Sequence, residues 1–333
     1  MSESSSKSKL KKKDGVAPLG PLALHHGGKL DDVELAWRLV GQPSSPTVLA
    51  MGGISAHRQT HSDVGEAPGW WQGVVGEGCA LDTTRLQVLS FDYLGGWGES
   101  SAPTLDQAWP AISPFDQAEL IGRLLKAINI SSLRAIVGAS YGGMVALAFA
   151  QRFPEQVAEL AVISAAERTH PMATAWRSVQ RNLVRFALRH GKEAEGLQLA
   201  RALAMSTYRS PEEFAQRFSG PARFEQGIAR FPVEDYLLAR GADYSTRYSA
   251  ASFLCLSQSI DLHQVDASRI SVPTRALAVI EDQLVPIDDM RRLCAKLPNV
   301  QLREMSSYYG HDAFLKESDT LQDWLQPLTG DVT

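Results

Sequence analysis

Short apolar runs recur along the chain, each ending at glycine or at acidic residues, and they predict the strands of a sheet. The runs that begin at residues 133, 157 and 274 are almost continuously apolar, which is typical of strands buried on both faces of a parallel sheet. The predicted strands span residues 33–41, 46–53, 85–96, 133–140, 157–166, 274–282 and 300–307.

Helical patterns separate several of these strands. In residues 114–128, apolar side chains recur every three or four positions, and residues 142–153 carry a second helical pattern directly after a strand. Residues 286–297 begin with Pro286 and two aspartates, which favour a helix start. Strands that alternate with helices indicate a doubly wound, mostly parallel α/β sheet with right-handed crossovers.

The alternation stops after residue 168, where the sequence predicts helices and loops but no clear strand. An insertion of this length usually forms a cap over the active-site end of such a sheet. We therefore expect an α/β core made of residues 18–168 and 265–330, and a helical cap made of residues 169–264.

Charge is spread unevenly over the 333 residues. The first thirteen carry five lysines and one glutamate, while the whole chain has a formal charge of −4, so the remainder is distinctly acidic. This argues against nucleic acid as the main partner. We expect residues 1–17 to form a disordered basic tail rather than a signal peptide, because the stretch that follows is broken by proline and glycine.

Two further observations bear on where in the cell the protein acts. No apolar run approaches the roughly 20 residues that a membrane span requires, so no membrane partner is expected. The three cysteines, Cys79, Cys255 and Cys294, are far apart and form no Cys-x-x-Cys motif, which suits the reducing cytoplasm.

One serine lies between glycines in "VGASYGGMVALAFA", directly after a predicted strand and before a predicted helix. Strand, Gly-x-Ser-x-Gly and helix together are typical of a nucleophile elbow, a tight turn that presents serine at the carboxyl end of the sheet. Gly138, Gly142 and Gly143 let the backbone turn back without steric clash. We therefore predict Ser140 as the nucleophile and the backbone N–H of Tyr141 as one oxyanion donor.

A serine hydroxyl is a poor nucleophile unless a base takes its proton. In this architecture the base is a histidine after the last strand, and its acid follows the preceding strand. Of the eight histidines, only His311 follows the strand at 300–307. Glu281 and Asp282 follow the preceding strand. We predict Asp282, with Glu281 as the fallback, because an acid followed by three residues and a proline before a helix is the usual arrangement.

A second oxyanion donor is expected from the loop after an early strand. The sequence "AMGGISAHRQTH" supplies that loop, and Gly52 or Gly53 would let the backbone approach an acyl oxygen closely. His57 and His61 are four residues apart in the same loop, but no acid or third histidine lies at ligand spacing. We therefore expect no metal site.

Other motifs narrow the choice among serine enzymes. They are "GWWQGVVGEGCALDTTRLQVLSFDYLGG", "GASYGGMVALAFAQRFPEQV", "STYRSPEEFAQRF", "VEDYLLARGADYSTRYSAASFLCLSQSIDLHQV" and "GHDAFL". In this order they resemble motifs of the homoserine O-acyltransferases of the α/β-hydrolase superfamily, over most of residues 22–326. The resemblance implies an α/β-hydrolase fold and ping-pong transfer of an acyl group from acyl-CoA to L-homoserine in methionine biosynthesis. It implies no bound cofactor.

An enzyme that holds a free amino acid needs a cation for the carboxylate and an anion for the ammonium group. Arg209 of "TYRS" can bind a carboxylate, and Asp312, directly after the predicted base, can face an ammonium group. The resemblance assigns these two residues the same roles. Tyr208, Trp70 and Trp71 could form the walls of the site.

The chain departs from the family pattern around the acyl group. The family usually has Gly-Gly-Ser-Met-Gly-Gly, whereas here Tyr141 follows the serine, and the segments "WGESS" and "GGISAHR" also differ. Acetyl-CoA is the common donor of the family, and a succinyl group would need a cation for its distal carboxylate. Arg58, beside the oxyanion loop, is one candidate. We slightly favour succinyl over acetyl.

Several alternatives stay open at this stage. The acceptor could be L-serine, the enzyme could be a carboxylesterase or thioesterase of the same fold, or the chain could be a non-catalytic binding protein. Arg177, Arg181 and Arg185 form one stripe of a predicted helix, which could meet CoA phosphates or simply be solvated. The apolar face of that helix could pack within the cap or against a second subunit. The resemblance favours a homodimer through cap helices.

Overall fold

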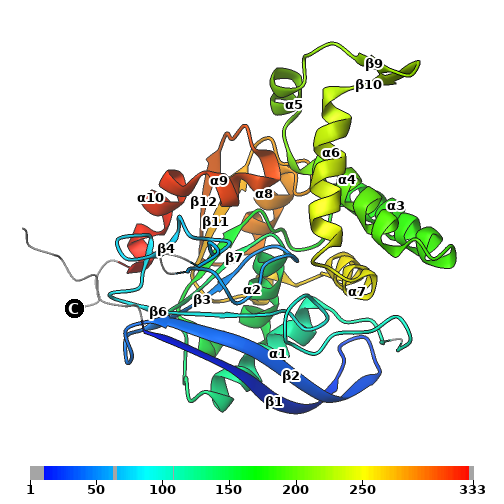
Figure 1. The fold of residues 1–333 in the computed structure, drawn as a ribbon. Helices are drawn as coiled ribbons and strands as arrows, with labels where there is room; N and C mark the ends of the chain where they lie inside the picture. Colours follow the sequence, from blue (N-terminus) through cyan, green and yellow to red (C-terminus); the bar gives the residue numbers. More distant parts are fainter. Residues whose placement is uncertain (1–10, 63–65, 108, 330–333) are drawn as a thin grey trace, which may run out of the picture.

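A central sheet of eight strands organises the molecule, in the order β1-β2-β6-β3-β7-β8-β11-β12 (Figure 1). The computed structural model describes residues 11–62, 66–107 and 109–329. From β6 to β12 neighbouring strands run parallel, and β1 and β2 join antiparallel at one edge. The strands are β1 (Lys12–Ala23), β2 (Lys29–Gly41), β3 (Thr47–Met51), β6 (Gln87–Phe91), β7 (Ala135–Ala139), β8 (Leu160–Ile163), β11 (Thr274–Val279) and β12 (Val300–Met305). The predicted doubly wound, mostly parallel sheet is confirmed.

The apolar runs correspond to the most buried strands. Every residue of β3, β7 and β8 is buried, because helices cover both faces of the sheet here. The helices outside the segment between β8 and β11 are α1 (Pro114–Ala127), α2 (Tyr141–Arg152), α8 (Ile287–Lys296), α9 (Ala313–Lys316) and α10 (Ser318–Thr329), and the short helices are η1 (Pro154–Gln156), η2 (Ala267–Arg269) and η3 (Gly310–Asp312). A small pair, β4 (Val75–Gly76) and β5 (Leu81–Asp82), lies outside the main sheet.

Strand β1 corrects one prediction. The basic tail was expected to extend through residue 17, but Lys12 to Ala23 form an edge strand that pairs with β2. Two glycines and two prolines hide its pattern, and the register shifts near Gly20. An edge strand tolerates such residues because only one of its sides needs hydrogen bonds. Residues 1–10 of the predicted tail lie outside the described residues.

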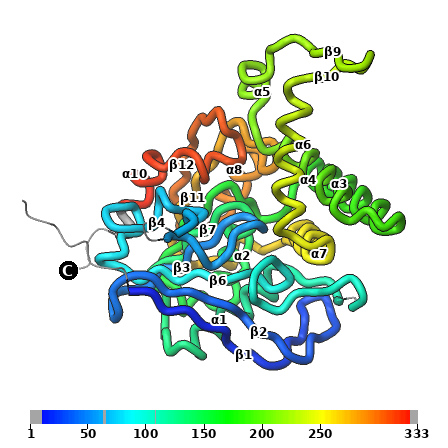
Figure 2. The backbone as a smooth tube through the Cα atoms, in the orientation of Figure 1, coloured from blue at the N-terminus to red at the C-terminus, as the bar shows by residue number. Residues whose placement is uncertain are grey.

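Between β8 and β11 the chain leaves the sheet and forms a segment that we call the cap. Its helices are α3 (Pro171–Arg189), α4 (Glu193–Tyr208), α5 (Pro211–Arg217), α6 (Pro232–Ser245) and α7 (Ala250–Asp261). Figure 2 shows this segment on one side of the molecule. The cap also holds a short hairpin of β9 (Arg223–Glu225) and β10 (Ile228–Arg230), which the sequence did not predict. Among the described residues, no helix is long and apolar enough to cross a membrane.

The turn from β7 into α2 is tightly packed. Gly142 donates its N–H to the Gly52 carbonyl at 2.9 Å, which ties α2 to the loop after β3. A Cβ atom at Gly142 would lie 2.6 Å from the backbone carbonyl carbon of Met51. Backbone atoms cannot move aside as the tip of a side chain can, so only glycine fits at this position.

We predict that Gly142→Ala lowers the free energy of unfolding by about 1–3 kcal/mol, the usual cost of overpacking. Urea denaturation followed by circular dichroism measures the change. Gly220→Ala is the matched control, because its Cβ would meet Pro232 at an ordinary 3.6 Å. Equal stability of the two variants would contradict the close approach of α2 and β3.

Candidate active site

A line of hydrogen bonds connects three side chains at the carboxyl edge of the sheet. The Oγ atom of Ser140 lies 2.8 Å from Nε2 of His311, and Nδ1 of His311 lies 2.7 Å from Oδ2 of Asp282. Ser140 follows β7, Asp282 follows β11 and His311 lies in η3 after β12. The structure therefore brings together residues that are up to 171 positions apart in sequence.

The backbone at Ser140 has φ 55° and ψ −121°, a strained combination for a residue with a side chain. Its N–H donates to the carbonyl of Ile163 on β8 at 2.8 Å. The strain places Oγ at the start of α2, directed at His311, instead of within the sheet. This geometry is that of the nucleophile elbow predicted from Gly-x-Ser-x-Gly.

Asp282 has the environment of an orienting carboxylate. Its side chain is fully buried, and Oδ1 accepts the N–H groups of Leu284 and Val285 at 2.8 and 3.0 Å. Oδ2 is thus left for His311. Glu281, the fallback, instead accepts from Ser306 and from the N–H of Ser307. Its carboxylate is committed elsewhere, so the geometry selects Asp282.

The His311 imidazole is tuned by this neighbour. Burial lowers the pKa of His311, but the negative charge of Asp282 and its hydrogen bond raise the pKa, and the net pKa lies above the ordinary value of histidine. Asp282 also holds the ring with Nε2 facing Ser140. The ring can therefore accept a proton from the serine and be stabilised when protonated.

The predicted oxyanion donors lie on two sides of Ser140. Gly53 lines the cavity beside Ser140, and neither its N–H nor that of Tyr141 has an acceptor among the described residues. The Gly52 carbonyl instead accepts the hydroxyl of Tyr93 at 2.8 Å. Of the two glycines, Gly53 is favoured as the donor, because it lines the cavity beside Ser140 and Gly52 does not. The sequence analysis did not identify Tyr93, whose hydrogen bond to Gly52 holds the loop after β3 in place.

A cavity of about 180 Å³ opens over Ser140 and His311. Its walls come from the loop after β3, from Trp70 and from cap helices α3, α4, α6 and α7. Trp70 is therefore a wall residue, as expected. Trp71 is not, because it is buried in the core and donates its indole N–H to the Phe314 carbonyl. Tyr208 also lines the cavity, with its ring centroid 6.0 Å from that of His311.

Arg209 and Asp312 lie next to each other rather than facing a substrate separately. Nε of Arg209 is 3.0 Å from Oδ2 of Asp312, and Nη1 is 3.3 Å from Glu213. Asp312 lines the cavity above Ser140, whereas Arg209 lines only a neighbouring cavity. The expectation that Arg209 meets the amino-acid carboxylate stays a prediction, and this geometry does not favour it, because the guanidinium already has two carboxylate partners and does not line the catalytic cavity.

Arg201 is the cation that sequence reasoning missed. Its guanidinium carbon lies over the rings of Tyr208 and Tyr244, 5.2 and 5.0 Å from their centroids, and Arg201 lines the catalytic cavity. No carboxylate among the described residues pairs with it; its one hydrogen bond is a long contact of 3.4 Å to the Tyr208 hydroxyl. Arg201 precedes Tyr208 by seven positions on α4, which is two helical turns. That spacing could have identified it as a neighbour on the same face.

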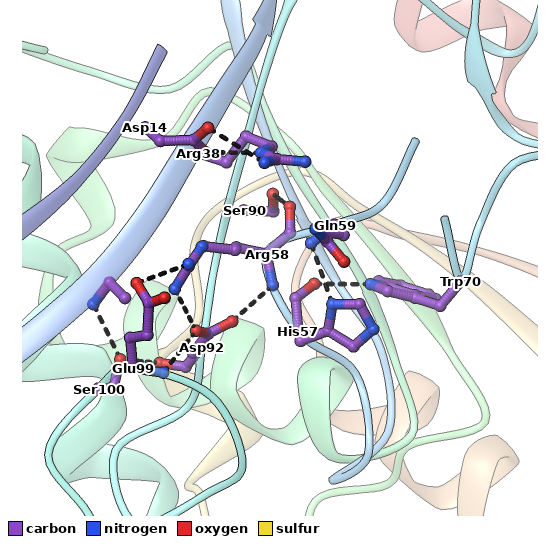
Figure 3. Close-up of polar contacts among 11 residues, drawn as sticks. Asp14, Arg38, His57, Arg58, Gln59, Trp70, Ser90, Asp92, Glu99 and Ser100 are labelled. Carbon is purple, nitrogen blue, oxygen red and sulfur yellow. Dashed lines mark hydrogen bonds and ion pairs between the residues drawn. The ribbon is translucent and has the colours of Figure 1, made fainter. Parts of the chain in front are cut away.

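Arg58 is placed away from the reacting groups. Figure 3 shows its side chain directed at Asp92 and Glu99, both at 2.6 Å, while its backbone N–H also donates to Asp92. Arg58 lines neither cavity. This geometry does not support the expectation that Arg58 binds a distal acyl carboxylate. The residue instead anchors the loop after β3, since the hydroxyl of Ser90 donates to its carbonyl at 2.6 Å.

Within the described ranges, no group of three or more histidine, cysteine, aspartate or glutamate side chains could hold a metal ion. The groups gathered around Ser140 are a serine hydroxyl, a histidine and free backbone N–H groups. These groups can form and resolve a serine ester.

Comparison with known proteins agrees with this geometry. Residues 50–318 match the family model for the alpha/beta hydrolase fold. The chain is 43% identical to a homoserine O-succinyltransferase of Xanthomonas campestris pv. campestris, covering 90% of this chain and 79% of that one. It is 33% identical to a homoserine O-acetyltransferase of Leifsonia xyli subsp. xyli, covering 94% and 88%.

The fold is also similar to the crystal structure of homoserine O-acetyltransferase from Bacillus anthracis. The TM-score is 0.85 at 18% identity, over 96% of this chain and 98% of that chain. Fold, sequence and the geometry around Ser140 agree, and the chain belongs to the homoserine O-acyltransferase family of the α/β-hydrolase fold.

Proposed function

We propose that this protein is an L-homoserine O-acyltransferase of methionine biosynthesis, which transfers a succinyl group from succinyl-CoA through Ser140. The observation that carries the proposal is the shared cavity. Ser140 and His311 line it together with an unpaired cation, Arg201, and a carboxylate, Asp312. A serine esterase needs only the first pair, whereas a free amino acid needs all four groups.

The first half of the reaction forms an acyl-enzyme. His311 takes the hydroxyl proton of Ser140 as Oγ attacks the thioester carbonyl of acyl-CoA. The N–H groups of Gly53 and Tyr141 stabilise the oxyanion of the tetrahedral intermediate. The carbon–sulfur bond then breaks, His311 gives its proton to the leaving sulfur, and free CoA departs.

The second half reverses these roles. His311 takes the proton of the homoserine γ-hydroxyl, whose oxygen attacks the ester carbonyl on Ser140. The ester bond to Oγ breaks, and His311 returns the proton to the serine. Water competes for the same ester, and helices of the cap that line the cavity support its exclusion.

The charges at one end of the cavity suit the amino acid. We assign the homoserine carboxylate to Arg201 and the ammonium group to Asp312. Arg209 binds Oδ2 of Asp312 at 3.0 Å and thereby positions this carboxylate without entering the catalytic cavity. The Tyr208 and Tyr244 rings hold the Arg201 guanidinium in place and shield it from solvent.

A second, larger cavity of about 900 Å³ provides a route for CoA. It shares part of its wall with the catalytic cavity, including Trp70, Arg201 and Asp312. Basic side chains also line it, which suits the CoA phosphates; besides Arg209, which acids already hold, they are Arg217, Arg240, Arg247 and Lys316. The thioester would then enter the catalytic cavity past Arg201.

We further propose a homodimer through cap helix α3. Met172, Val179 and Phe186 are spaced by seven residues along this helix, and each is roughly half exposed, at 52, 52 and 58%. An apolar row of this kind supports a partner helix. The protein would act in the cytoplasm, where its three free cysteines would stay reduced.

Thiol release from succinyl-CoA and acetyl-CoA, each with L-homoserine, with L-serine or with no amino acid, tests the proposed function. We expect fast release only with homoserine, and faster release with succinyl-CoA. Ser140→Ala should lower kcat by at least ~10⁴-fold, because the acyl-enzyme cannot form. Release at the same rate without an amino acid would instead establish a thioesterase, and a preference for serine would change the acceptor.

The assignment of Arg201 predicts a selective loss. Arg201→Gln should raise the homoserine KM by ~10–100-fold, since a hydrogen-bonded charge pair is lost. Initial rates at varied homoserine and fixed acyl-CoA measure this change. A rise of the same size in the KM for acyl-CoA, with none for homoserine, would mean that Arg201 serves the CoA route instead.

The pH dependence follows from His311. Only the neutral imidazole accepts a proton, and the pKa of His311 is raised, so kcat/KM should climb with pH until it passes that pKa. Asp282→Asn should move this acid limb to lower pH, because the raising charge is gone, and should lower kcat by ~10³–10⁴-fold. Rate profiles of the two proteins test the assignment. An unmoved limb would show that another group controls it.

A further inference from the structure

The catalytic cavity has an end that the proposed function leaves unexplained. Residues of α3 and α7, including Trp176, Arg177 and Ser257, line only this cavity and not the neighbouring one. Arg201 and Asp312, by contrast, line both. The α3–α7 end therefore lies away from the shared wall. An acyl-CoA that enters past Arg201 would present the far end of its acyl group here.

At this end, two arginines share one aspartate. Arg177 and Arg181, one helical turn apart on α3, both pair with Asp261 on α7, at 2.7 and 2.6 Å. Each of the three side chains is about 90% buried, with 10 or 11% exposed. Thr174 also donates to Asp261 at 2.8 Å. Two guanidinium groups and one carboxylate leave one excess positive charge.

The two arginines are not equivalent. Arg181 is held on three oxygens, since it also donates to the carbonyl and hydroxyl of Ser257 at 2.9 and 3.1 Å. Among the described residues, Arg177 forms its hydrogen bond and ion pair with Asp261 alone, and it is the one of the two arginines that lines the catalytic cavity. Asp289, another acid in the cavity wall, is already paired with Arg292. The excess charge therefore belongs to Arg177.

An unmatched buried cation is costly unless an anion joins it. It also acts on the catalytic base, because the positive charge of Arg177 disfavours the protonated form of His311. An anionic group on the substrate would neutralise both effects. The other cations of the cavity are less suited, because Arg201 faces the shared wall and Arg168 is exposed to solvent.

We propose that Arg177 binds the distal carboxylate of a dicarboxylic acyl group, such as succinyl, while that group is attached to CoA or to Ser140. Arg181 remains on Asp261 and keeps this carboxylate from competing for Arg177. The inference rests on the proposed acyltransferase function and supplies the cation that Arg58 does not. A methyl end, as in acetyl, would leave the charge unmatched, so the subsite selects the donor.

Donor selectivity tests the inference. We expect Arg177→Gln to lower the ratio of kcat/KM for succinyl-CoA to that for acetyl-CoA, both with homoserine, by ~10–100-fold. Arg177→Lys, which keeps the charge, should restore part of the ratio. Arg185→Gln is the matched control, since Arg185 lies two turns further along the same helix, exposed to solvent. Its ratio should equal that of the wild type.

The outcomes are distinguishable. An equal fall in kcat/KM with both donors would overturn the inference, because Arg177 would then have only a structural role. A wild-type preference for acetyl-CoA would also overturn it. If the wild type shows no homoserine-dependent release from either donor, the proposed function itself fails.

Should Arg177→Gln not fold, as judged by circular dichroism, inhibition of the wild type replaces it. Succinate should inhibit thiol release at a concentration at least ~10-fold lower than butyrate, which lacks the second carboxylate. Equal inhibition by the two acids would overturn the assignment of Arg177.

Discussion

The hydrogen bond between Ser140 and His311 depends on a backbone turn that few sequences can form. Ser140 has a positive φ, and α2 approaches β3 so closely that Gly142 has no room for a Cβ atom. Buried strands on both sides of β7 hold this turn, and their packing offsets its strain. If the turn relaxed, Oγ of Ser140 would lose its hydrogen bond to His311, and the cavity would lack a correctly placed nucleophile.

Parallel strand order explains why residues from distant segments meet at this turn. β3, β7, β11 and β12 all point their carboxyl ends to the same edge of the sheet. Gly53, Ser140, Asp282 and His311 each follow one of these strands. The parallel sheet therefore brings the predicted oxyanion donors, nucleophile, acid and base close together. Under the proposed function, the cap adds the groups that determine substrate specificity.

The acidic partners of each arginine distinguish the arginines that line the catalytic cavity from those that lie outside it. Arg209 and Arg58 are held by acids, so they shape the site from outside the catalytic cavity. Arg201 and Arg177 face the cavity, with positive charge that no acid fully matches. One lies at the wall shared with the larger cavity, and the other lies at the end between α3 and α7. Under the proposed function, this separation would give the two substrates separate cationic contacts around a single serine.

The sequence pattern predicts every strand of the main sheet except β1, and it predicts the residues of the hydrogen-bonded line. Continuous apolar runs predict buried strands, and the order of Ser140, Asp282 and His311 along these strands leaves few choices for which groups meet. It could not reveal β1, because glycine and proline obscure the pattern of an edge strand, nor the short hairpin of the cap. Only the tertiary contacts show which arginines are paired with acids outside the catalytic cavity and which line it. Partners such as Arg58 with Asp92, or Arg181 with Asp261, come from elements 34 and 80 positions apart, and no local periodicity encodes that contact.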